Sequence, residues 1–306
     1  MSLPSDIADK LRVPLIAAPM FLVSGPDLVI ATCRAGAIGS FPTANCRTLE
    51  DLDAWLGRMV EETEGAAPFA PNLIVHKSNA RLQEDAALVA QHKAPLVIAS
   101  VGSPAPIMDT IHGYGGRVFA DIASMRHAEK AIATGVDGLI LLTAGAGGQT
   151  GWANPFAFVR AVRDIYDGPV VLAGGISDGV ALKAAMTLGC DLAYMGTRFI
   201  ATQESMAVAG YKEMLVSSSL DDVMLSSAFT GLPASKLRPS MVAAGIDPDA
   251  LPERGMINVS EDINPDKRPK RWKDIWSAGH SVSGVKDLPP VADLVERVAR
   301  EFNDVR

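Results

Sequence analysis

The sequence predicts a (β/α)8 barrel, and three observations carry that prediction. Eight short apolar runs recur along the chain, each followed by a loop rich in glycine, proline, serine or asparagine and then by a longer helical pattern. The runs are apolar at successive residues, as expected for parallel strands that are buried on both faces. Glycine loops follow the last two runs, whereas no Gly-x-Gly-x-x-Gly loop follows the first, so a doubly wound open sheet is the less favoured alternative.

The apolar runs have the length of strands and the segments between them have recognisable helix ends. The runs are VPLIAA, AIGS, FAPNLIV, LVIAS, RVFADI, GLILL, VVLAGG and LAYMG, which begin at residues 13, 37, 69, 96, 117, 138, 170 and 192. Ser124 and Asp178 each stand where a side chain can cap the helix that follows, and Gly135 and Gly189 stand just beyond the ends of those helices. Pro155 occupies a first-turn position, where its missing N–H costs nothing.

After the eighth run the alternation of strand and helix stops. Residues 204–217 predict one more helix, and residues 290–302 predict an amphipathic closing helix. Between them, residues 219–285 carry short helical pieces, several prolines and glycines, and no strand pattern. An insertion at this point lies over the mouth at the carboxyl ends of the strands. We therefore expect a barrel of residues 1–218 and 286–306 and a small helical cap of residues 219–285.

Composition and charge narrow the functional class. A chain of 306 residues with 48% hydrophobic and 21% charged residues fits a soluble protein with a sizeable core. The net charge of −7 argues against a general affinity for nucleic acid. The basic run KRPKRWK at residues 267–273 is expected to be a solvated surface segment. No stretch reaches the ~18 uninterrupted apolar residues of a membrane span.

The cysteines and the amino terminus indicate a reducing compartment. Cys33, Cys46 and Cys190 have no Cys-x-x-Cys spacing and no neighbouring histidines, which argues against a disulfide framework or a zinc site. The first residues lack a basic start followed by an apolar core, so no secretory signal is predicted. We expect a cytoplasmic protein without a metal site that acts on small molecules, and the composition is compatible with a homodimer.

The loop AGAGGQTG at residues 144–151 is the richest in candidate site residues. It follows the sixth run and holds four glycines around Gln149. Glycine lets the backbone take positive φ and come close to a ligand, and parallel strands place ligand sites beyond their carboxyl ends. The carboxamide of Gln149 can orient or polarise a substrate oxygen, but it has no usable basicity.

Two further glycine loops predict a phosphate site. They occupy residues 173–176 and 195–198, directly after the seventh and eighth runs. In barrels this region commonly binds a phosphate through backbone N–H groups, and Thr197 can add a hydroxyl. The residues alone leave open whether the phosphate belongs to a substrate or to a cofactor.

Six segments in order along nearly the whole chain form a more specific pattern. They are PLIAAPM (14–20), PNLIVHKSN (71–79), AGAGGQTG (144–151), LAGGISDG (172–179), YMGTRFIATQES (194–205) and IWSAGH (275–280). In combination they resemble the nitronate monooxygenase family, formerly called 2-nitropropane dioxygenases, which includes related FMN-dependent reductases. The resemblance implies an FMN-binding TIM barrel with a helical cap.

The resemblance also implies which residues bind FMN. The backbone of Ala18, Pro19 and Met20 would lie along the edge of the isoalloxazine ring, and Asn72 would hydrogen-bond the ring. At Asp121 many relatives have a basic or amide side chain, and an anionic side chain there would disfavour a negatively charged reduced flavin. The implied phosphate-binding residues are Gly174, Gly175, Gly196 and Thr197. The two glycines Gly147 and Gly148 would pack close to them.

The largest departure from the family pattern is Gln149, because relatives commonly have a histidine there that deprotonates a nitroalkane. A nitronate already carries the carbanion, so its oxidation needs no such base. His76, just beyond the third run, and His280 are the histidines expected on the functional side. Gln149 and His76 are therefore the two candidate catalytic residues.

Three hypotheses for the function follow. The first is oxidation of small alkyl nitronates with O2 by an FMN-dependent enzyme. The second is an NAD(P)H-dependent flavin reductase of quinones or activated alkenes, including enoyl thioesters, which also needs no base. The third, from a different class, is a flavin-free lyase or isomerase that binds a phosphorylated substrate.

Overall fold

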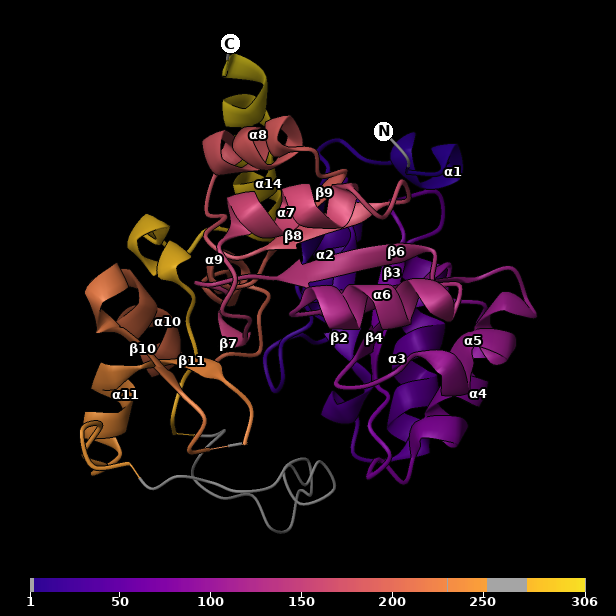
Figure 1. The fold of residues 1–306 in the computed structure, drawn as a ribbon. Coiled ribbons are helices and arrows are strands. Elements are labelled where there is room, and N and C mark those ends of the chain that lie inside the picture. The colour runs from indigo at the N-terminus through magenta and orange to yellow at the C-terminus, as the bar shows by residue number, and fades with distance from the viewer. Residues whose placement is uncertain (1–2, 230, 252–273, 306) are drawn as a thin grey trace.

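Eight parallel strands form a barrel in the computed structural model, which describes residues 3–229, 231–251 and 274–305 (Figure 1). The barrel strands are β1 (Leu15–Ala17), β2 (Gly39–Pro42), β3 (Phe69–Ile74), β4 (Leu96–Ser100), β5 (Arg117–Ile122), β6 (Gly138–Leu142), β8 (Val170–Ala173) and β9 (Leu192–Met195). Their order in the sheet is β1-β9-β8-β6-β5-β4-β3-β2. Ile38 links β2 to β1, because its N–H donates to Leu15 at 2.9 Å and its carbonyl accepts from Ala17 at 2.8 Å. The predicted TIM barrel is confirmed.

Helices surround the barrel, and their ends follow the predicted capping chemistry. The Ser124 hydroxyl accepts from the His127 N–H at 3.2 Å, and the Asp178 carboxylate accepts from the Ala181 N–H at 2.8 Å. The helices are α1 (Ser5–Ala8), α2 (Pro26–Arg34), α3 (Leu49–Glu62), α4 (Leu82–Gln91), α5 (Ala105–His112), α6 (Met125–Ala133), α7 (Pro155–Arg163), α8 (Gly179–Leu188), α9 (Thr197–Ile200), α10 (Ala209–Ser217), α11 (Arg238–Ala243) and α14 (Val291–Asp304). The closing helix α14 packs against α2 and α8 and so completes the ring.

The barrel interior is a packed core rather than a channel. It is filled by side chains that alternate along the strands, among them Ile16, Ile38, Leu96, Ile98, Phe119, Ile140, Val171 and Leu192, all fully buried. A larger apolar cluster fills the layer between the strands and the helices. The filled interior leaves no room for a ligand inside the barrel, and the cap lies beyond the carboxyl ends of its strands.

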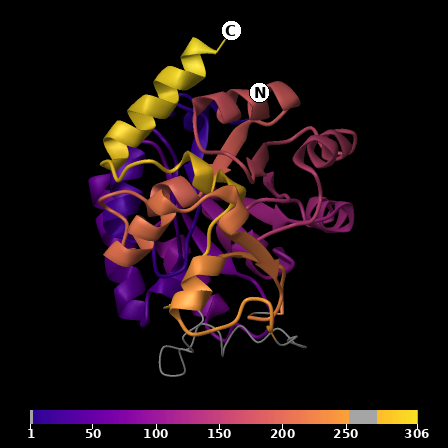
Figure 2. The same ribbon diagram turned by 90° about the vertical axis from the view of Figure 1, so that its left-hand side faces the viewer.

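The cap contains strands that the sequence pattern did not predict. The strand β10 (Val223–Ser226) pairs antiparallel with β11 (Ala234–Leu237), and β11 pairs with β7 (Gly148–Gln149) from the predicted glycine loop. The cap, which was predicted to be helical, therefore contains these strands as well as the helix α11. β10 has only three successive apolar residues and β11 includes a lysine, so neither forms an apolar run as long as those of the barrel strands. Figure 2 shows the cap, in orange, in front of the barrel.

Parts of the cap lie outside the described residues, including the basic run at 267–273. The proposed limits of the cap, residues 219 and 285, stay a prediction. Among the residues that the structure describes, no helix is long and apolar enough to cross a bilayer.

Candidate active site

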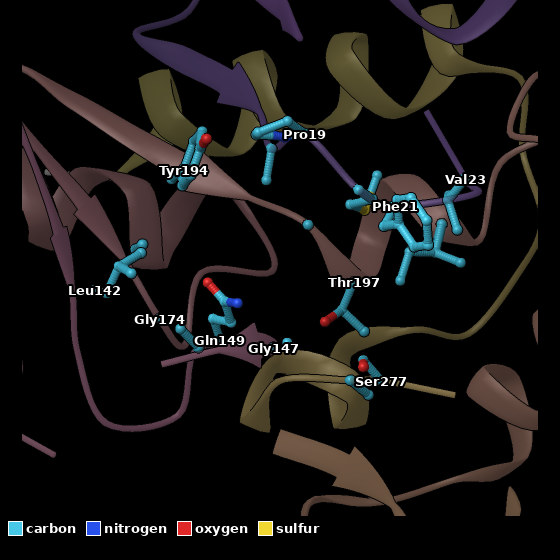
Figure 3. A pocket seen from close by; sticks show the side chains of 18 of the residues that line it. Pro19, Phe21, Val23, Leu142, Gly147, Gln149, Gly174, Tyr194, Thr197 and Ser277 are labelled. Carbon is cyan, nitrogen blue, oxygen red and sulfur yellow. The ribbon is translucent and has the colours of Figure 1, made fainter. Parts of the chain in front are cut away.

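A cavity opens at the carboxyl ends of the barrel strands, beneath the cap (Figure 3). Every barrel strand contributes a residue at or near its carboxyl end: Ala18, Pro42, Asn72, Ser100, Asp121, Leu142, Ala173 and Tyr194. The cap adds Leu232 and the segment from Ile275 to Ala278 on the opposite side. Each of the predicted site residues lines this cavity except His76.

The Gln149 carboxamide points into the cavity (Figure 3). Its backbone belongs to β7, where Gln149 is paired with Ala234 of the cap, and the next N–H, from Thr150, donates to Pro233 at 3.1 Å. Its side chain makes no hydrogen bond to any other residue that the structure describes. The backbone of Gln149 is therefore fixed by the sheet, while both donors and the acceptor of its carboxamide are open to a ligand.

The glycines around Gln149 allow the loop to pack closely against residues 278–280. A Cβ on Gly147 would lie 2.7 Å from the Gly279 nitrogen, and one on Gly145 would lie 2.8 Å from the His280 ring. The His280 N–H also donates to the Gly145 carbonyl at 2.9 Å. The loop can thus sit against residues 278–280 only with glycine at these positions, a reason that the sequence pattern did not reveal.

Backbone donors stand free where the phosphate site was predicted. In the described part of the chain, the N–H groups of Gly175, Ile176, Gly196 and Thr197 donate to no other backbone or side-chain group. All four residues line the cavity. Gly175 has φ +75°, and a Cβ there would meet nothing within 4 Å, so its outer side is open to a ligand. Open N–H groups in neighbouring loops form the kind of site that binds an anion.

Thr197 and Gly174 complete this group. The Thr197 hydroxyl accepts from the Gly279 N–H at 2.9 Å, which leaves its own proton to donate to a ligand. A Cβ on Gly174 would lie 2.5 Å from the Thr143 hydroxyl, so the chain passes too close to Thr143 for any larger residue. The two loops from the ends of β8 and β9 are thereby fixed beside each other and beside Gly279.

A half-buried amide shapes the loop of Ala18, Pro19 and Met20. Asn45 accepts from the Leu22 N–H at 2.8 Å and donates to the carbonyls of Met20 at 3.1 Å and Ser24 at 2.7 Å. Leu22 has φ +62°, a strained value for a residue with a side chain. Sequence reasoning missed Asn45, because nothing near it along the chain indicates that it braces a loop after β1.

Asn72 is positioned as a hydrogen-bond acceptor. It donates both of its amide protons, one to the Ile98 carbonyl at 3.2 Å and one to the Ser100 hydroxyl at 3.0 Å. Its oxygen accepts from the Ser100 hydroxyl at 3.3 Å and keeps a lone pair for the cavity. Asn72 can therefore accept from a ring N–H, as the family resemblance implies, but cannot donate without losing a bond.

Asp121 and Tyr194 place two unsatisfied polar atoms at the cavity floor. Among the described residues, neither Asp121 Oδ1 nor the Tyr194 hydroxyl has a hydrogen-bond partner, and both atoms are buried. Burial raises the pKa of Asp121 to about 7, and burial followed by the nearby Asp121 carboxyl raises the pKa of Tyr194 well above its usual value. Sequence reasoning missed Tyr194, although a hydroxyl inside an otherwise apolar run was a signal.

None of the five histidines lines the cavity. His76 lies in the loop beyond β3, where its Nδ1 is 2.7 Å from the Ser78 hydroxyl. His280 is exposed and its ring packs on Gly145. The structure therefore does not bring the candidate base His76 to the site, and no lysine, arginine or histidine of the described chain shares the cavity wall with Gln149.

Comparison with known proteins shows which protein family this chain resembles. The model of the nitronate monooxygenase family matches residues 5–301. A nitronate monooxygenase from Paraburkholderia phytofirmans is 28% identical over 94% of this chain and 92% of its own. The structure of FabK from Thermotoga maritima has a TM-score of 0.82 at 25% identity, covering 98% of this chain and 95% of that one. A nitroalkane oxidase from Streptomyces ansochromogenes has a TM-score of 0.83 at 23% identity, covering 97% and 98%.

The cavity fits a flavin nucleotide on its own geometry. Open backbone donors around Gly175 and Thr197 suit a phosphate, and the free lone pair of Asn72 suits a ring N–H. The cavity walls between them are largely apolar, as a flat aromatic ring requires. Because the family model spans nearly the whole chain and the residues present fit the cofactor, the chain belongs to the nitronate monooxygenase family and is a flavin-dependent oxidoreductase.

Proposed function

We propose that the chain uses FMN to oxidise small alkyl nitronates with O2, and that Gln149 orients the nitronate. The observation that carries this proposal is a cavity in which a carboxamide, with no histidine beside it, faces the substrate space. A neutral nitroalkane must lose a carbon-bound proton before oxidation, whereas a nitronate has already lost it. Because Gln149 is a carboxamide and no histidine lines the cavity among the described residues, the substrate-facing side chains are matched to the nitronate.

FMN, rather than a flavin without phosphate, is supported by the free donors of the β8 and β9 loops. The N–H groups of Gly175, Ile176, Gly196 and Thr197 would bind its phosphate, and the Thr197 hydroxyl would add a further donor. Bound there, FMN would supply the transfer of electrons from the substrate to O2. The loop of Ala18, Pro19 and Met20 would hold one edge of the ring, since Asn45 fixes its backbone.

Gln149 would act through its amide protons. They can donate to the two oxygens of a nitronate, which carry most of its negative charge, and so fix the carbon in one orientation. The pairing with β11 fixes the point from which the carboxamide extends, because the Gln149 backbone is part of the cap sheet.

A comparison of a preformed nitronate with the corresponding neutral nitroalkane tests this function. We expect kcat/KM for the nitronate to exceed that for the nitroalkane by roughly 10²–10⁴, the usual contribution of a general base. Gln149→His should raise nitroalkane oxidation and change nitronate oxidation little. His76→Ala and His280→Ala are the controls and should leave both rates near wild type. Rapid nitroalkane oxidation by the wild type that disappears in His76→Ala would show that the base lies elsewhere.

A second candidate is an NAD(P)H-dependent reductase of quinones or activated alkenes. The same observation favours it, because an amide N–H can polarise a carbonyl acceptor and no base is required. Anaerobic mixing with NADH or NADPH separates the two functions: rapid bleaching of the flavin, with no turnover of either nitro compound, would favour the reductase. Membership of this family argues against the flavin-free lyase or isomerase.

A further inference from the structure

The floor of the cavity holds a carboxyl group with no counter-charge among the described residues. Asp121 lies on β5 and Tyr194 on β9, with β6 and β8 between them, and both line the cavity. No lysine, arginine or histidine lines the cavity in the part of the chain that the structure describes. Within that same part, the one other titratable side chain on the cavity wall is Tyr211, and its hydroxyl is used on the Ser277 carbonyl.

The polar side chains of the two preceding strands cannot satisfy Asp121, and the nearby Tyr194 hydroxyl makes no hydrogen bond to it. Asn72 has committed both amide protons, and the Ser100 hydroxyl is engaged with Asn72 in both directions. What remains accessible on Asp121 faces the cavity that it lines. A buried polar group with no partner in the protein destabilises the fold, so such a group is usually matched by a ligand or serves a function.

We propose that Asp121 is a neutral carboxylic acid that donates a hydrogen bond to an acceptor atom of the bound flavin ring, with Tyr194 as a second, separate donor. This inference rests on the proposed binding of FMN. A carbonyl or ring nitrogen of a flavin is an acceptor, and the two groups that lack partners are those that can supply protons. Asn72, which can only accept, complements them by taking a ring N–H.

The protonation state of Asp121 then controls binding. The raised pKa of its carboxyl, which burial causes, keeps a large share of the group protonated near neutral pH. When the carboxyl ionises it loses the proton that it donates and sets a negative charge against ring acceptors. Flavin binding therefore favours the protonated form, and affinity falls as pH rises through this pKa. Tyr194 stays neutral over the same range, so its contribution does not change with pH.

The test is FMN affinity against pH, measured on the full chain by quenching of FMN fluorescence between pH 5.5 and 9. The wild-type Kd should rise by roughly tenfold per pH unit above the carboxyl pKa. Asp121→Asn should remove that rise. Tyr194→Phe should raise the Kd by roughly 3- to 10-fold at every pH and keep the rise. The phosphate of FMN titrates near pH 6 in every variant, so its effect cancels when the variants are compared with wild type.

Controls separate a failed inference from a failed function. Asp109→Asn removes an exposed carboxylate of α5 and should match wild type at every pH. Asp121→Ser is a second variant without the carboxyl, for use if Asp121→Asn does not fold, as judged by circular dichroism. If wild type and the Asp121 variants bind FMN with the same pH dependence, the role of Asp121 is wrong while the proposed function stands. If no variant binds FMN at any pH, both are wrong.

Discussion

At the scale of a single residue, Asp121 shows how burial alone raises the pKa of a carboxyl group. Its ordinary pKa is 3.8, and burial raises it to about 7. Between these two values the folded protein binds a proton that the unfolded chain has released. The free energy of unfolding therefore falls as pH rises from about 4 to about 7, and the loss stays constant above that range.

This linkage predicts that Asp121→Asn stabilises the protein at pH 8. The amide keeps the shape of the carboxyl but carries no charge to bury, so its melting temperature at pH 8 should exceed that of wild type. The gain should shrink as the pH is lowered and should vanish below pH 4, where the carboxyl is protonated in both the folded and the unfolded wild type. Equal gains at pH 4.5 and pH 8 would mean that the charge of Asp121 is not the cause.

At the scale of a single structural element, the loop after β8 allows the predicted phosphate site to be tested. Gly175 has φ +75° and open space beside it on the cavity side. Gly175→Leu should place a side chain where the phosphate would lie, and the strained φ adds on the order of 1–2 kcal/mol. We expect purified Gly175→Leu to contain little FMN while keeping the circular dichroism spectrum of a folded barrel.

A matched control for the loop lies on the outside of the barrel. Gly135 has φ +80°, and a Cβ there would meet nothing within 4 Å, but this glycine is absent from the cavity wall. Gly135→Leu therefore carries the same backbone strain without reaching the cofactor, and it should purify with full flavin content. Full flavin content in Gly175→Leu as well would show that the phosphate binds elsewhere.

At the scale of the whole molecule, residues of the barrel and residues of the cap form different walls of the same cavity. Trp276 of the cap segment stacks on Tyr211 of α10, with ring centroids 5.0 Å apart and planes 10° apart, and both line the cavity. Because neither residue belongs to a barrel strand, this stacked pair shapes the side of the cavity away from the strand ends.

Trimming the cap should therefore affect substrate more than cofactor. Trp276→Ala should raise KM and broaden the range of substrate sizes, with flavin content near that of wild type. Leu220→Ala, which truncates an exposed side chain of the same cap outside the cavity, is the control and should change neither. Loss of flavin from Trp276→Ala at an unchanged KM would assign this part of the cap to the cofactor.

The sequence by itself determined the barrel and most of the cavity wall. Strand and helix alternate locally, and parallel strands of a barrel must end on the same side, so residues such as Asn72, Asp121 and Thr197 meet wherever the chain closes. Glycine loops were also readable, since few other residues tolerate positive φ at positions such as Gly175.

Only the tertiary structure decided how distant segments meet. The pairing of Gln149 with Ala234 joins the glycine loop to the cap, and Asn45 braces a loop that precedes it by more than twenty residues. His76 falls outside the cavity although it follows a barrel strand closely. The pKa of Asp121 depends on what surrounds it from across the barrel. Contacts and burial of this kind arise between residues far apart in the chain, so no local pattern encodes them.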